Sequence, residues 1–155
     1  MNKNTTKIII DFLTSIHINV IEKELTNNTF LPGLSLLGNT ILMDSNKLKY
    51  PGDLLHEAGH IATTEEHKRQ LIGTSKMDTT WPTDGDEIAT IIWSFAACRY
   101  LKLDLEVVFH PNGYKNDANW LITQFSNKNY IGLPLLEWMN LCNKNDFPEM
   151  IKWLR

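Results

Sequence analysis

Two histidines and a glutamate stand at helical spacing in the string His56-Glu57-Ala58-Gly59-His60. Residues four apart on a helix lie on the same face, one turn above each other, so His56 and His60 can present two imidazoles to one ion. Glu57 projects from nearly the same side and can reach a water bound to that ion. This H-E-x-x-H pattern predicts a helix that binds zinc and supplies a general base.

The element that carries this string must be a buried helix. Its flanks are apolar on both sides, as a buried catalytic helix requires: Leu54, Leu55, Ile61 and Ala62. Ala58 and Gly59 are small, so another element can pack close to the helix. The run Pro51-Gly52-Asp53 begins it, with Asp53 as the N-cap or in the first turn, where its charge suits the helix dipole.

A catalytic zinc usually has three protein ligands and one open position, so a third ligand must come from elsewhere in the chain. Glu87 is the prediction, because it opens an otherwise apolar helix and shares a face with apolar neighbours. A carboxylate on such a face needs a partner such as a metal ion. Asp86 is the main rival and Asp84 a weaker one, and Glu87 could also be an acid that merely suits the helix dipole.

The set His56, Glu57 and His60, with Glu87 on a following helix, resembles the zincin metallopeptidases and, more narrowly, their glutamate-ligand branch, the gluzincins. The resemblance covers roughly residues 51–100 and extends to the minimal cytosolic zincins of bacteria. It implies a zincin-like fold and one Zn²⁺ held by His56, His60 and Glu87. It also implies that Glu57 activates a zinc-bound water to attack a peptide bond.

The chain departs from the family pattern in two places. Ile91 stands four residues after Glu87, where many gluzincins carry a second acid, which leaves the support of the two histidines unassigned. Glu66 stands six residues after His60, where a metzincin would carry a third histidine ligand, so that pattern is absent.

A proteolytic site also needs a donor for the oxyanion that forms during attack. His110 and Tyr114 are candidates, since they flank a tight turn that follows an expected strand. Gluzincins commonly use a histidine or tyrosine here, and the resemblance therefore favours the pair. The alternative is that His110 hydrogen-bonds the turn and Tyr114 packs on the core. His17 and His67 are expected to be surface or structural residues, and Trp81 could line a substrate cleft.

Composition narrows the class of protein. The formal net charge is -3 over 155 residues, which gives no electrostatic case for nucleic acid or an anionic membrane as a partner. No apolar run reaches the length of a membrane span. Cys98 and Cys142 lie in apolar stretches and are expected to be small buried residues rather than a disulfide, which suits a cytoplasmic location.

The pattern along the chain predicts a helix-rich α+β fold, one domain over 1–155, with a small β-sheet packed beside the motif helix. Other helices are expected at 5–16, 84–101, 117–126, 133–142 and after a cap at Asp146. Strands are expected at 17–20, 34–37, 40–44 and 105–109, with Gly38-Asn39 as a primed hairpin turn. The polar stretch 63–83 is long for a connection and is a candidate lid.

Together these features predict a zinc-dependent metallopeptidase-like hydrolase that acts on a peptide or protein. Two other readings stay open. One is a binding or regulatory protein that keeps the metal site without proteolysis. The other is a structural domain in which His56 and His60 are core residues and no metal binds. The ligand set could also hold non-haem iron, but a glutamate between the histidines favours hydrolysis.

Overall fold

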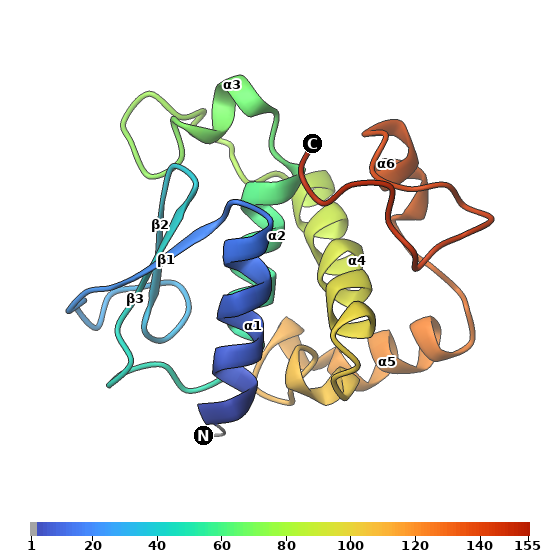
Figure 1. Ribbon diagram of the computed structural model, residues 1–155, viewed down its shortest axis with the longest axis horizontal. Helices are drawn as coiled ribbons and strands as arrows, with labels where there is room; N and C mark the ends of the chain where they lie inside the picture. The colour runs from blue at the N-terminus through green and yellow to red at the C-terminus, as the bar shows by residue number, and fades with distance from the viewer. Residues whose placement is uncertain (1–2) are drawn as a thin grey trace.

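The computed structural model describes residues 3–155 and places a mostly helical chain around a small sheet (Figure 1). The N-terminal part contains α1 (Lys3–Ser15), β1 (Asn19–Glu22), β2 (Leu34–Leu37) and β3 (Thr40–Met43). The middle contains α2 (Asp53–Thr63), α3 (Glu66–Arg69) and α4 (Asp84–Tyr100). The last part contains the 3-10 helices η1 (Leu105–Val107) and η2 (Tyr114–Asn116), then α5 (Ala118–Ser126) and α6 (Leu133–Trp138). The predicted α+β class is confirmed.

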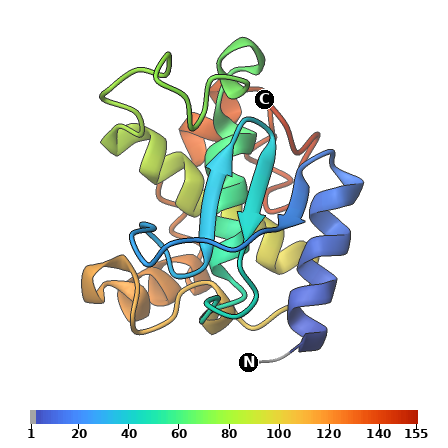
Figure 2. The ribbon, with the colours of Figure 1, turned by 90° about the vertical axis from the view of Figure 1, so that its left-hand side faces the viewer.

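Within the described residues, the sheet has three strands in the order β1-β3-β2. β1 pairs in parallel with the central strand β3, and β2 pairs with it in antiparallel register, with Leu36 opposite Ile41. The predicted hairpin between β2 and β3 is confirmed, and Gly38 at its tip has a φ of +60°, which a primed turn requires. Figure 2 shows the sheet lying over α2, with α1 alongside.

Helix α2 is the centre of the fold, because all of its residues are buried. It packs most extensively against α4 on one side and meets α1, β2 and β3 on the other. Gly59 makes the contact with α4 possible, since a Cβ there would lie only 2.9 Å from the Cγ2 atom of Thr90. The expectation of a buried helix with a closely packed neighbour is therefore confirmed, and this packing sets the distance between the two helices.

The predicted strand at 105–109 is wrong, since residues Leu105–Val107 form a 3-10 helix. The β-branched and aromatic residues suggested a strand, but the backbone N–H groups are used locally: Val108 and Phe109 both donate to the Leu105 carbonyl. The chain turns here because it lies against the start of α2, where a Cβ at Gly52 would overlap the Val107 carbonyl. Val108 and Phe109 still reach the core, where both are buried.

The predicted C-terminal helix capped by Asp146 is also wrong. The chain turns after α6 and comes back on itself, with Cys142 and Met150 forming an isolated antiparallel bridge. The N–H of Ile151 donates to the Leu141 carbonyl at 2.9 Å. The backbone of this segment therefore makes hydrogen bonds to the segment that follows α6, rather than the bonds of a helix. α6 itself ends at Trp138, four residues before the expected 142.

Two smaller expectations concern the middle of the chain and its cysteines. The stretch 63–83 contains one short helix, α3, and is otherwise irregular. Cys98 and Cys142 are free and buried, as their apolar context predicts. None of the helices within residues 3–155 is long and apolar enough to cross a bilayer.

Candidate metal centre

One face of α2 brings three potential ligand residues together. His56, Glu57 and His60 each offer an atom, and these atoms all lie within 4.8 Å of one another. The three residues are only 7%, 8% and 5% exposed, respectively. This is the cluster that helical spacing predicts. Its burial requires each polar group to have a partner, because an unpaired buried polar group is costly.

Glu87, in the first turn of α4, faces both imidazoles. Its Oε2 atom lies 3.4 Å from His56 Nε2, and its Oε1 atom lies 3.2 Å from His60 Nε2. Burial acts to raise the pKa of Glu87, but hydrogen bonds from the two imidazoles outweigh burial and hold this pKa well below its usual range. The carboxylate therefore stays ionised at any pH at which a metal would bind.

The rival acids are placed differently. Asp86 forms a capping box with Thr83: its carboxylate accepts from the Thr83 backbone N–H at 2.8 Å, while its own N–H donates to the Thr83 hydroxyl at 3.2 Å. Asp84 is exposed at the end of the helix. Both acids thus belong to the start of α4, and the structure brings only Glu87, of the three, to the imidazoles.

Each imidazole has a hydroxyl on its other nitrogen. The Tyr114 Oη atom lies 3.2 Å from His56 Nδ1, and the Thr90 Oγ1 atom lies 3.1 Å from His60 Nδ1. Both Nε2 atoms consequently point toward Glu87. Partners of this kind fix the orientation of metal-binding histidines. Thr90 was not among the predicted site residues, although its place three residues after Glu87 on the same helix was a usable signal.

The two separations between Glu87 and the imidazoles suit a tetrahedral metal ion. Two ligand atoms, each about 2.1 Å from such an ion, lie about 3.4 Å apart. The separations of 3.4 and 3.2 Å between Glu87 and the imidazole nitrogens match this value. Two imidazoles and a carboxylate are ligands that zinc accepts, and three protein ligands leave a fourth place for water or substrate.

Glu57 lies beside this donor set, and its carboxyl group is a weaker acid than usual. Burial raises its pKa from the ordinary 4.5 to about 7; the charge of His56 acts in the opposite direction, while those of Glu87 and Asp53 add to the rise. A carboxyl group with a pKa near neutrality can both accept and return a proton at physiological pH. The environment is therefore suited to general-base chemistry.

His110 lies close by but is bound to another residue. Its Nε2 atom is 2.7 Å from Asp53 Oδ1, and its ring stacks on Tyr50 with centroids 3.8 Å apart. Burial raises the pKa of Asp53, while the hydrogen bond to His110 and its charge oppose the rise. Among the described residues, His110 Nδ1 and Asp53 Oδ2 are buried atoms without a hydrogen-bond partner. The Nε2 atom of His110 is thus engaged with Asp53, and an oxyanion role for this residue stays a prediction.

Tyr114 contacts the cluster through a histidine. Its ring lies 5.2 Å from Phe109 and 5.6 Å from His56, measured between centroids, and its hydroxyl is engaged with the His56 imidazole. Burial raises the pKa of Tyr114 above its usual range, so the hydroxyl stays protonated. The ring therefore packs as one alternative from the sequence expects, while a role as oxyanion donor stays a prediction.

The remaining candidates are two histidines and a tryptophan. His17 and His67 are both exposed, as expected for surface residues. Trp81, on the connection before α4, places its ring 5.6 Å from His60. It is half-buried, so one part of it contacts the centre while another faces solvent. An indole at this place can form one wall of a substrate site.

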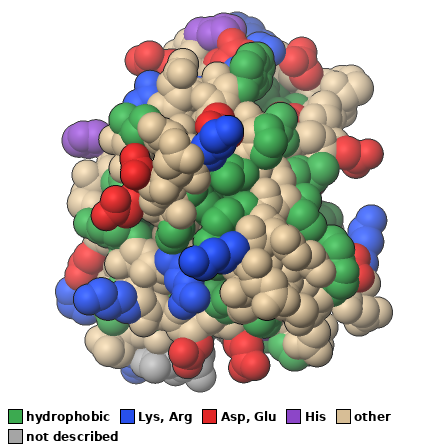
Figure 3. All heavy atoms as spheres, turned by 90° about the vertical axis from the view of Figure 1, so that its right-hand side faces the viewer, with side chains coloured by type: hydrophobic (Ala, Val, Ile, Leu, Met, Phe, Trp, Pro, Cys, Tyr) green, Lys and Arg blue, Asp and Glu red, His purple; other side chains and the backbone are tan. Residues whose placement is uncertain are grey.

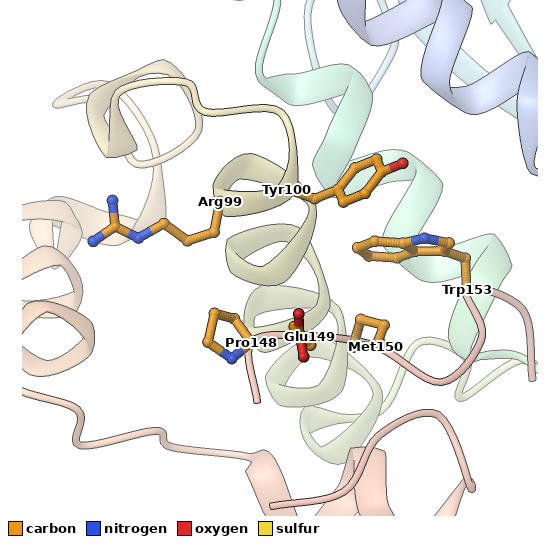
Figure 4. Close-up of a pocket in the computed structure, with 6 residues that line it drawn as sticks. All are labelled: Arg99, Tyr100, Pro148, Glu149, Met150 and Trp153. Carbon is orange, nitrogen blue, oxygen red and sulfur yellow. The ribbon is translucent and has the colours of Figure 1, made fainter. Parts of the chain in front are cut away.

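A pocket of about 500 Å³ lies at the C-terminal end of α4 (Figure 4) and is lined by Arg99, Tyr100, Pro148, Glu149, Met150 and Trp153. Arg99 is twelve residues after Glu87, or roughly 18 Å along the helix, so this pocket is separate from the candidate metal centre. On the face seen from the α5 and α6 side, acidic, basic and apolar side chains are interspersed (Figure 3).

Comparisons of this chain with protein-family models, with curated proteins and with solved structures found no match. The case for a function therefore rests on the residues and geometry of the centre itself.

Proposed function

We propose that this protein is a zinc-dependent metallopeptidase-like hydrolase of the zincin type. One observation supports the proposal above all others: the Nε2 atoms of His56 and His60 and the carboxylate of Glu87 converge, at separations of 3.4 and 3.2 Å, beside a buried Glu57. Three donors and an adjacent base are the parts that metal-assisted hydrolysis needs.

His56, His60 and Glu87 would hold one Zn²⁺. The ion would supply Lewis acidity, which lowers the pKa of water and polarises a carbonyl oxygen. Glu57 accepts the proton of the attacking water and returns it to the leaving nitrogen, and its raised pKa supports both transfers. The hydroxyl of Thr90 holds the His60 imidazole in place while the proton moves.

The proposed substrate is a peptide or protein whose amide bond is cleaved. Trp81, in ring contact with His60, is placed to pack against the substrate beside the ligands. We also propose a cytoplasmic location, which the two buried free cysteines support, because disulfides persist mainly in oxidising compartments.

The test separates binding from chemistry. Protein purified without added metal is analysed for zinc, and hydrolysis is followed on a mixture of unfolded peptides with and without a chelator. Glu57→Gln should keep the zinc and lose hydrolysis, whereas Glu66→Gln, the same change at an exposed glutamate on α3, should leave both intact. If the folded protein does not bind zinc, the proposal is wrong. Zinc without hydrolysis in the wild type would favour a regulatory protein that retains the centre.

A further inference from the structure

A tyrosine hydroxyl lies behind His56. The Tyr114 Oη atom lies 3.2 Å from His56 Nδ1, while His56 Nε2 lies 3.4 Å from the Glu87 carboxylate. The two nitrogens of this imidazole therefore have different partners, and Tyr114 is the partner of the one that does not face Glu87.

The direction of the hydrogen bond to Tyr114 follows from where a metal ion would bind. An ion at His56 Nε2 needs the lone pair of that nitrogen, so the proton of the neutral imidazole lies on Nδ1. The Tyr114 oxygen, 3.2 Å away, is then the acceptor of that proton.

The backbone that carries Tyr114 is held in an unfavourable conformation. Three consecutive non-glycine residues have positive φ angles: Tyr114 at 58°, Lys115 at 51° and Asn116 at 72°. Left-handed backbone costs free energy at each such residue and persists only where the surroundings enforce it. Here the surroundings are the ring contacts with Phe109 and His56 and the hydrogen bond between the Tyr114 hydroxyl and His56.

From this geometry we propose that Tyr114 is a positioning residue of the metal centre. Its hydroxyl holds His56 with Nδ1 protonated and Nε2 directed at the ion, and the strained turn 114–116 holds Tyr114 in that place. The inference rests on the proposed function in requiring a metal at His56, but it adds a role that the three ligands and the base do not include. Metal binding and the conformation of the turn are consequently coupled, each favouring the other.

The experiment measures Zn²⁺ affinity by competition with a chelator, using the full chain. Tyr114→Phe keeps the ring and removes the hydroxyl, and should weaken Zn²⁺ binding by about 10- to 100-fold, the usual effect of losing a partner of a ligand histidine. Tyr130→Phe is the matched control: it makes the same change at a tyrosine that packs on Phe95 and Phe147, away from the centre, and should leave affinity unchanged.

A spectroscopic measurement separates positioning from general loosening of the fold. In the zinc-loaded protein, imidazole Nδ1–H proton resonances are expected from both ligand histidines. The His56 resonance should shift and exchange faster with water in Tyr114→Phe, while the His60 resonance, supported by Thr90, stays in place. If wild type binds zinc and Tyr114→Phe binds equally well with an unchanged His56 resonance, the inference is overturned and the proposed function stands. If folded wild type binds no zinc, both fail.

Discussion

Stability of the metal-free protein should fall as pH rises from about 4.5 to 7, because of Glu57. In the folded chain, burial raises the pKa of this carboxyl to about 7 from its ordinary 4.5. Between these values the folded state holds a proton that the unfolded state has released, so rising pH favours unfolding. At 1.36 kcal/mol per pH unit, the expected loss is about 3 kcal/mol across the window.

The assay compares urea unfolding of wild type and Glu57→Gln, both treated with a chelator, at about pH 5 and about pH 8. Glutamine does not titrate, so the difference between the two proteins isolates Glu57 from other titrating groups. Glu87 does not interfere in this range, because its lowered pKa gives stability that is lost only as pH falls below its ordinary 4.5. The wild type should lose about 3 kcal/mol relative to the variant between the two conditions.

The reasoning is refuted if the difference in unfolding free energy between wild type and Glu57→Gln is the same at both pH values within about 0.5 kcal/mol. That result would mean that water reaches Glu57 and removes the effect of burial on its pKa. Adding Zn²⁺ back gives a second comparison. A divalent cation beside the carboxylate favours its ionised form, so the loss of wild-type stability with rising pH should shrink.

Three other outcomes are expected. Glu87→Ala should lower metal affinity by more than about 100-fold. Asp86→Ala should keep the metal stoichiometry that elemental analysis measures. It should lower the unfolding free energy by about 1 kcal/mol, because the helix cap is lost. Gly59→Ala should destabilise the fold by about 1–3 kcal/mol in urea unfolding, because its Cβ would push α4 away from α2; an unchanged midpoint would contradict the packing described. His110→Ala should cost about 3 kcal/mol by leaving Asp53 buried without its partner, and adding Asp53→Asn should restore part of that loss.

The sequence predicted the convergence of the two histidines, because local spacing decides it. His56 and His60 are one turn apart on a single helix, so their convergence needs no tertiary information. Glu87 was a candidate because it shares a face with apolar neighbours, although an acid in the first turn of a helix is common. The spacing of Thr83 and Asp86 is itself a capping-box pattern, and it could have assigned Asp86 to the start of α4 from the sequence.

The partners of the imidazoles could not be predicted, because they depend on distances between elements. Thr90 reaches His60 only since Gly59 lets α4 approach α2. Tyr114 reaches His56 from a turn in which residues 114–116 all have left-handed backbone, a conformation that non-glycine residues rarely adopt. The error at 105–109 has the same origin: the residues favour a strand, but a strand needs a neighbouring strand, and here the chain lies against the first turn of α2.

The complete burial of α2 has a consequence for the proposed zinc site. A buried helix opens only at a high free-energy cost, whereas partly exposed helix ends open more easily. His56 and His60 lie on α2 and would stay in place when an ion leaves, while Glu87, in the partly exposed first turn of α4, would be the ligand that moves. An emptied site would keep both imidazoles in register and would refill without a refolding step.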